Sequence, residues 1–290
     1  MTRRYPGTMR VMARSEWSAR ASAHAETVDA LLRDHLDRRR RGIKHPVEDF
    51  LFEYYSYRPG QLRRWFPGAG VVLEGASPDE FPGHRDGTLD LPAFLARRGD
   101  TVRWVRDLLA ATASRPAQLG CFGMHEWAMV YRSPETRHAW PLRLGGAATD
   151  AVVEERGVRC SHFDAFRFFT APARPLNVLQ PTRDDQVRNE QPGCLHATMD
   201  LYKWAHKLAP LTPAELILDC FRLAREVRVL DMRASPYDFA ALGYEPVRIE
   251  TPEGRAEYAA TQRGFAERGA ALRARLLDVL TPEIVAHEPV

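Results

Sequence analysis

Three of the four cysteines in this 290-residue chain are each followed closely by a histidine, in the pairs Cys121 and His125, Cys160 and His162, and Cys194 and His196. Thiolate and imidazole groups bind zinc, and two histidines with a carboxylate bind non-haem iron. His125, His162 and His196, with Asp164 or Asp200, therefore form a candidate metal set. The pairs lie roughly 35 residues apart and include neither CxxC nor HExxH. The competing interpretation is that the cysteines are small core residues.

Three carboxylates offer a different chemistry, because Glu126, Asp164 and Asp200 each lie in an aromatic-rich segment. Apolar surroundings raise the pKa of a carboxylate unless a base or hydrogen bonds keep it ionised. A neighbouring histidine can position such a group for proton transfer or for stabilising a cationic transition state. This pattern fits cleavage of an N-glycosidic bond, although it fits other hydrolyses too. A helix cap or an ion-pair partner is the structural alternative.

The segment that must position several of these groups is Glu190 to Leu208, EQPGCLHATMDLYKWAHKL. Pro192 suits the first turn of a helix, and the apolar residues that follow recur at helical spacing. His196 and Asp200 are four residues apart and share one face, with Lys203 one turn further on. We expect this face to form the wall of a site in which the three imidazoles converge. The alternative is a buried helix with a hydrogen-bonded His196–Asp200 pair.

The remaining elements predict a mainly α protein, a single globular helical domain over residues 24–290 with a few short strands. Residues 1–23 are basic and aperiodic, so we expect a flexible arm there. A helix from Ala25 ends in the run Arg38–Arg41, which either complements the helix dipole or binds phosphates. Residues 45–68 interleave aromatic rings with arginines such as Arg58. That pattern is typical of nucleic-acid contacts, but also of a core helix with ion pairs.

Composition excludes several classes of protein. No apolar run approaches membrane-spanning length, and the N-terminus lacks the apolar middle of a signal peptide, so we expect a cytoplasmic protein without a membrane partner. Four cysteines are too few for a disulfide framework. The net charge is only +3, from 41 basic against 38 acidic residues, and says little about partners.

Five segments of the chain also resemble a known group of proteins: HPVEDFLFEYYSYRPGQLRRW, GMHEWAMVYR, RCSHFDAFRFF, EQPGCLHATMDLYKWA and LDMRASPYDF. They are similar to segments of actinobacterial proteins labelled 3-methyladenine DNA glycosylase, over roughly residues 45–265. The resemblance implies removal of an alkylated purine base from DNA.

The first functional hypothesis is therefore a DNA base-excision N-glycosylase that needs no cofactor. Asp200, Asp164 or Glu126 would support the attack of water, with His196 orienting it. The residues expected to contact the extruded base or the DNA backbone are Trp127, Tyr202, Lys203, Trp204 and Arg58. The first alternative is a metal-dependent enzyme acting on a small molecule, with zinc or non-haem iron held by His125, His162 and His196. The second alternative is a non-enzymatic nucleic-acid-binding protein.

Overall fold

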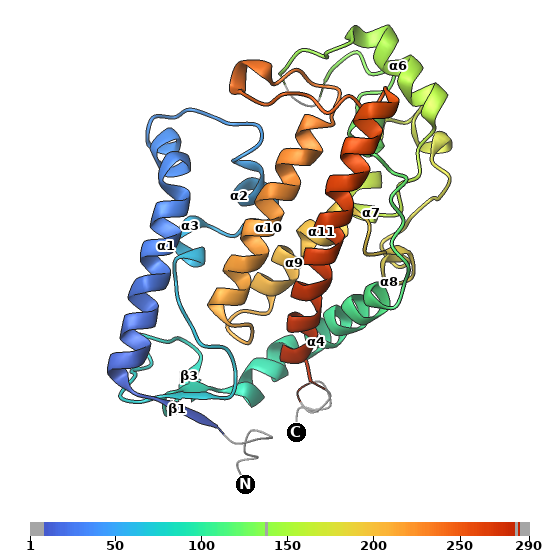
Figure 1. Cartoon of the computed structure of the whole chain (residues 1–290). Coiled ribbons are helices and arrows are strands. Elements are labelled where there is room, and N and C mark those ends of the chain that lie inside the picture. The colour runs from blue at the N-terminus through green and yellow to red at the C-terminus, as the bar shows by residue number, and fades with distance from the viewer. Residues whose placement is uncertain (1–8, 137–138, 282–283, 285–290) are drawn as a thin grey trace. The chain divides into compact units, whose positions relative to one another are not determined.

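A computed structural model of the chain describes residues 9–136, 139–281 and 284, and it confirms the predicted mainly α class with a few short strands (Figure 1). The α-helices are α1 (Arg14–Arg40), α2 (Phe50–Tyr54), α3 (Pro59–Leu62), α4 (Leu91–Ala113), α5 (Met124–Ala128), α6 (Gly145–Arg156), α7 (Phe163–Phe166), α8 (Gln186–Asn189), α9 (Leu195–Lys207), α10 (Ala214–Arg233) and α11 (Pro252–Val279). Two 3-10 helices are η1 (Arg174–Leu176) and η2 (Ala240–Leu242). The strands are β1 (Arg10–Met12), β2 (Val71–Leu73), β3 (His84–Arg85) and β4 (Thr88–Leu89).

The chain divides into two compact units, and each is described by itself. Unit 1 comprises residues up to Leu109, Leu201–Arg222 and the residues from Leu272 onward. Unit 2 comprises Ala110–Asp200 and Leu223–Ala271. The chain passes from one unit to the other within α4, α9, α10 and α11.

Helix α1 begins at Arg14, so the expectation of a flexible arm over residues 1–23 was wrong for residues 14–23. Residues 10–12 form β1 and residues 14–23 form the first turns of α1, while residues 1–8 lie outside the described residues. The helix is held by one face, whose buried residues are Trp17, His24, Val28, Leu32 and His35. Because this face continues two turns before Ala25, apolar burial extends the helix to Arg14. The helix ends at Arg40, before Gly42 in the left-handed region (φ +69°).

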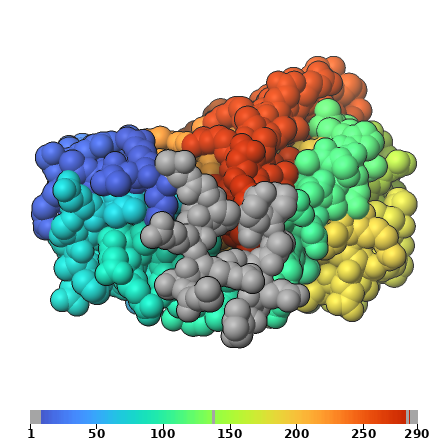
Figure 2. Space-filling view, turned by 90° about the horizontal axis from the view of Figure 1, so that it is seen from below, coloured from blue at the N-terminus to red at the C-terminus, as the bar shows by residue number. Residues whose placement is uncertain are grey.

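Two small sheets belong to the same unit. Strands β1 and β2 pair in parallel, with Arg10 opposite Val71 and Met12 opposite Leu73. In the space-filling view the segment that contains β1 and α1, in blue, lies beside the segment that contains β2, in cyan (Figure 2). Strands β3 and β4 form an antiparallel pair.

Unit 2 surrounds the region in which the polar residues converge. The first turns of α9, the last turns of α10 and the first part of α11 all contribute, together with the short helices α5, α7 and α8. Within the described ranges, no helix is long and apolar enough to cross a membrane.

Candidate functional site

Unit 2 encloses a concentration of ionisable side chains that are at most 8% exposed. They are His125, Glu126, His162, Glu190, His196, Asp200, Arg228 and Asp231. We call these residues the buried cluster. Ionisable groups are seldom buried to this degree unless they are paired or bind a metal.

Close backbone contacts hold the segments that carry the cluster. Gly123 has φ +71° and turns the chain into α5, from which His125 and Glu126 project. Before α9, a Cβ on Gly193 would lie 2.5 Å from the carbonyl oxygen of Gln118, so only glycine fits there. The side chain of Gln262 donates a hydrogen bond of 2.6 Å to the Gly193 carbonyl. These contacts fix the start of α9 and therefore the position of His196.

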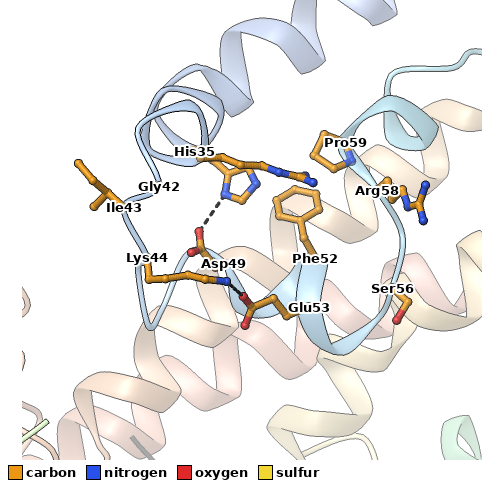
Figure 3. Close-up of a pocket in the computed structure, with 11 residues that line it drawn as sticks. His35, Gly42, Ile43, Lys44, Asp49, Phe52, Glu53, Ser56, Arg58 and Pro59 are labelled. Carbon is orange, nitrogen blue, oxygen red and sulfur yellow. Dashed lines mark hydrogen bonds and ion pairs between the residues drawn. The ribbon is translucent and has the colours of Figure 1, made fainter. Parts of the chain in front are cut away.

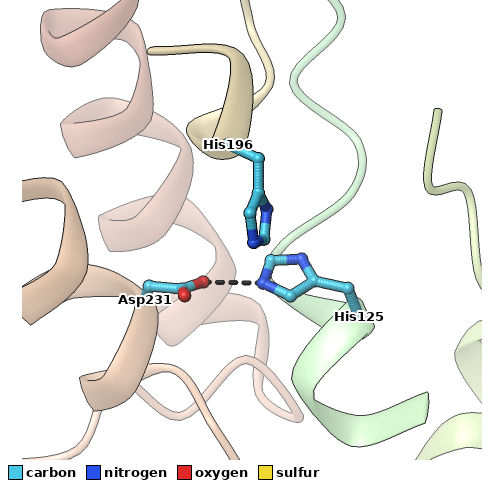
Figure 4. A group of neighbouring side chains, drawn as sticks. All are labelled: His125, His196 and Asp231. Carbon is cyan, nitrogen blue, oxygen red and sulfur yellow. Dashed lines mark hydrogen bonds and ion pairs between the residues drawn. The ribbon is translucent and has the colours of Figure 1, made fainter. Parts of the chain in front are cut away.

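The first half of the cluster joins α5, α9 and α10 (Figure 4). His125 Nε2 lies 2.8 Å from Asp231 Oδ1, and the His196 ring lies 4.4 Å from the His125 ring, centre to centre. The guanidinium of Arg228 donates hydrogen bonds to the other oxygen of Asp231, at 3.0 Å, and to Glu126, at 3.1 Å. Arg228 thus links Glu126 to the His125–Asp231 pair.

The second half of the cluster is centred on His162, which precedes α7 and is fully buried. His162 Nε2 lies 3.3 Å from Glu190 Oε1 and 3.4 Å from Asp200 Oδ2. Neither ring nitrogen of His162 makes a directed hydrogen bond with any residue that the structure describes. The His162 and His196 rings are stacked with their centres 5.1 Å apart. His196 therefore connects the two halves.

The three imidazoles differ in their proton affinity. Burial lowers the pKa of His125, but the adjacent Asp231 carboxylate outweighs burial and raises it well above its usual range. For His162, burial is likewise outweighed by Asp200 and Glu190, which raise the pKa to about 9. Burial and the positive charges of His125 and His162 lower the pKa of His196 well below its usual range. At neutral pH, His196 is thus a neutral ring between two cationic ones when no metal is bound.

Thiols lie close to the cluster, as the paired cysteines in the sequence suggested. Cys121 Sγ is 3.9 Å from His125 Nδ1, and Cys160 is 2% exposed. All four cysteines of the chain are free. Burial raises the pKa of the Cys160 and Cys194 thiols, so both stay protonated.

The structure confirms that the imidazoles of His125, His162 and His196 converge, although they are buried rather than exposed in an open pocket. Asp200 also belongs to the cluster, but the histidine at ion-pair distance from it is His162. The four-residue spacing of His196 and Asp200 therefore predicted correctly that both lie on the cluster face of α9. The histidine that pairs with Asp200 is His162 and not His196. Glu126 belongs to the cluster through its hydrogen bond with Arg228.

Other residues expected at the site lie in different surroundings. Asp164 is outside the cluster and lies 3.3 Å from Arg167 Nε and 3.9 Å from Arg183 Nη2. Trp127 is fully buried and donates its indole N–H to the carbonyl of Ala234 at 2.8 Å. A DNA base could stack on this ring only after the surrounding chain moved.

The remaining expected residues belong to unit 1. Tyr202 is fully buried, and Trp204 is 5% exposed and packs edge-on against Trp104, with ring centres 5.0 Å apart. The ammonium group of Lys203 lies 4.5 Å from the centre of the Trp204 ring. Arg58 is exposed and begins the segment of α3.

Glu190, Arg228 and Asp231 are cluster residues that were not among the expected site residues. Arg228 and Asp231 are three residues apart on the buried face of α10, among apolar residues such as Val227 and Leu230. Charged residues inside an otherwise apolar helix face are the signal that could have identified them.

Two groups in the cluster have the composition of metal sites: His125, His196 and Asp231, and His162, Glu190 and Asp200. In each group, one potential ligand atom per residue lies within 4.8 Å of the other two. No protein-family model, curated protein or solved structure matches the chain, so the geometry of the cluster itself is the basis for inferring a function.

Proposed function

We propose that the chain is a metal-dependent oxidoreductase whose buried cluster binds two ions of iron or manganese. The observation that carries this proposal is the pair of adjacent triads, one with two histidines and a carboxylate, the other with one histidine and two carboxylates. The stacked rings of His196 and His162 join the triads. Their proximity favours a two-metal centre over two unrelated sites.

The distances between ligand atoms support this proposal. Two ligand atoms bound at about 2.1 Å to one ion are about 3 Å apart at a right angle and about 4.2 Å apart on opposite sides. The separations of 3.3 and 3.4 Å in the second triad lie in this range. The separation of 2.8 Å between His125 and Asp231 in the first triad is slightly below it. Little movement of the side chains would be needed for each triad to hold an ion.

The charges of the cluster also favour a cation. The cluster contains four carboxylates, those of Glu126, Glu190, Asp200 and Asp231, but only one guanidinium, that of Arg228, which bonds Glu126 and Asp231. Buried carboxylates are costly unless cations compensate them, and protons on the imidazoles or metal ions can do so. His162 Nε2 lies 3.3 and 3.4 Å from the carboxylates of Glu190 and Asp200, where a bound ion could replace the imidazole proton. Its Nδ1 is buried and has no hydrogen-bond partner among the described residues, and such an atom costs about 1 to 3 kcal/mol.

The donor set and its burial narrow the chemistry. Two histidines with one carboxylate are typical of non-haem iron, and carboxylate-rich sites suit manganese. Bound ions would supply a redox centre at which dioxygen oxidises a small organic substrate. With all six ligand residues at most 8% exposed, a molecule as small as dioxygen reaches the cluster more easily than the bulky substrate of a hydrolase. Arg228 would remain a positioning residue that holds Asp231.

Metal analysis of the purified chain tests the proposal. We expect close to two equivalents of iron or manganese per chain after loading, and uptake of dioxygen by the reduced iron form in an oxygen electrode. Changing His196 to Ala should lower the metal content by at least one equivalent. His24→Asn is the matched control, because it alters a buried histidine of unit 1 that bonds the Leu62 carbonyl. A folded chain that binds only a small fraction of one equivalent of metal after loading would refute the two-metal centre.

Base excision from DNA remains a second candidate because of one specific observation. Four of the five segments that resemble proteins labelled 3-methyladenine DNA glycosylase supply cluster residues, among them His125, His162, Asp200 and Asp231. Release of methylated purine from duplex DNA, measured with and without a chelator, separates the two functions. Base release that persists in chelator-treated protein and falls about a hundredfold in Asp200→Asn would favour the glycosylase.

A further inference from the structure

Unit 1 contains a pocket of about 430 Å³ that is independent of the buried cluster (Figure 3). It lies between the end of α1, the turn that follows, α2 and the start of α3. Its volume is in the range of small-molecule sites. The charged residues that line it are Arg39, Lys44, Asp49, Glu53 and Arg58, which gives the lining a net positive charge.

A histidine with one unused nitrogen lies at this pocket. His35 is only 7% exposed, and its Nδ1 lies 3.0 Å from Asp49 Oδ1. The ionised carboxylate can only accept hydrogen bonds, and its other oxygen accepts one from the backbone N–H of His45 at 2.9 Å. His35 therefore carries its proton on Nδ1, which leaves Nε2 as an acceptor.

Packing fixes the orientation of the His35 imidazole, but its acceptor atom, Nε2, accepts no hydrogen bond from a described residue. The ring packs against Phe52 with ring centres 4.4 Å apart. Nε2 is buried and has no hydrogen-bond partner among the residues that the structure describes. Burial is the main cause that lowers the pKa of His35, and the charges of Arg38 and Arg39 lower it further against the effect of Asp49. The ring is thus neutral at physiological pH and suited to receive a hydrogen bond from a ligand.

The cations at the pocket are not equally available. Lys44 Nζ lies 2.6 Å from Glu53 Oε1 and is already paired. The guanidinium groups of Arg39 and Arg58 pair with no carboxylate in the described part of the chain, and both line the pocket. Guanidinium groups match the oxygens of phosphate and can bind them in a bidentate manner. Two unpaired arginines at one pocket favour a doubly charged phosphoryl group over a singly charged carboxylate.

We propose that this pocket binds a small phosphate ester that carries a hydroxyl group, such as a sugar phosphate. Arg39 and Arg58 bind the phosphoryl oxygens, and His35 Nε2 accepts a hydrogen bond from the ligand's hydroxyl. Asp49 holds the imidazole in the tautomer that this requires. The inference goes beyond the metal-dependent function and rests on different residues.

Calorimetric titration of the full chain with ribose 5-phosphate, inorganic phosphate and ribose tests this inference. Ribose 5-phosphate should bind most tightly, inorganic phosphate more weakly, and ribose without measurable affinity. The double variant Arg39→Gln/Arg58→Gln should lose at least about tenfold in affinity for both phosphates, in line with the loss of charged hydrogen bonds. Arg33→Gln, which alters another exposed arginine of α1, is the matched control and should bind as the wild type does.

The role of the imidazole has its own readout. His35→Gln should reduce the preference for ribose 5-phosphate over inorganic phosphate while leaving the affinity for phosphate nearly unchanged, with folding checked by thermal melting. Absence of saturable binding of ribose 5-phosphate, or equal affinity in wild type and the double arginine variant, would overturn the proposal. Arginine-dependent binding of duplex DNA without binding of ribose 5-phosphate would overturn it as well. The metal content of the double variant should stay at the wild-type value, which separates this test from that of the metal centre.

Discussion

Replacing Arg228 with methionine tests whether the buried cluster is held by its single guanidinium. Arg228 is 2% exposed and donates hydrogen bonds to Glu126 and Asp231, which are 5% and 0% exposed. Methionine fills a similar volume but removes the positive charge. Two carboxylates then remain in a buried environment without their shared donor.

The expected cost follows from these contacts. A hydrogen bond to a charged group is worth about 1.5 to 3 kcal/mol, and Arg228 makes two of them. Removing one partner of a buried ion pair costs about 3 to 5 kcal/mol, because the other charge is left uncompensated. We therefore expect Arg228→Met to lower the free energy of unfolding by about 3 to 5 kcal/mol. Adding Glu126→Gln should recover part of this loss, since one of the two stranded charges is then absent.

Urea unfolding followed by circular dichroism at pH 7 measures these differences. Arg268→Met is the matched control, because Arg268 makes two hydrogen bonds of 2.6 and 2.7 Å with Glu226 at a half-exposed position. Exposed pairs contribute about 0 to 1 kcal/mol, so this variant should be nearly as stable as the wild type. An effect of Arg228→Met no larger than that of Arg268→Met would refute the reasoning.

Two further predictions concern other parts of unit 2. A Cβ on Gly254 would lie 2.0 Å from the Arg248 carbonyl oxygen, so Gly254→Ala should lower the free energy of unfolding by about 1 to 3 kcal/mol or more. Gly264 is on the same helix and a Cβ there would meet open space, so Gly264→Ala should raise the free energy of unfolding by about 0.5 to 1 kcal/mol. Equal melting temperatures of the two variants would contradict this. Burial raises the pKa of Glu250, but hydrogen bonds of 3.0 and 3.1 Å from Arg143 outweigh burial and lower it. The ion pair therefore stabilises the fold above the unfolded pKa of about 4.3 and stops doing so as the pH falls through the lower folded value. Glu250→Gln should lower the free energy of unfolding at pH 7, and the difference from the wild type should shrink below about pH 4. A difference in stability that does not change with pH would exclude the ion pair as its cause.

Local signals accounted for the helical class and for part of the cluster. The apolar spacing after Pro192 predicted α9. The aromatic segments around His125 and His162 indicated that these two histidines lie at one site. Residue spacing on one helix also selected the face of α9 that carries His196 and Asp200. Such features depend on residues close in sequence, which is why the sequence alone could reveal them.

The rest of the cluster depends on contacts between distant segments. Nothing near Asp231 in the sequence indicates that its partner is His125, and Glu190 lies in a loop whose path is set by tertiary packing. The first turns of α1 were missed because their apolar face has few residues before Ala25, with Trp17 as its main anchor. Tertiary packing decided each of these cases over local propensity.

The sequence separation within the cluster has a consequence for how the chain folds. The His125–Asp231 and Glu126–Arg228 pairs join residues 106 and 102 positions apart. Closing loops of that length costs conformational entropy before the contacts return any stabilisation. We therefore expect the helices to form early and the cluster to assemble late, after the folding barrier has been crossed. Substitutions in the cluster should then accelerate unfolding while leaving the refolding rate almost unchanged, so that its buried ion pairs determine the lifetime of the native state.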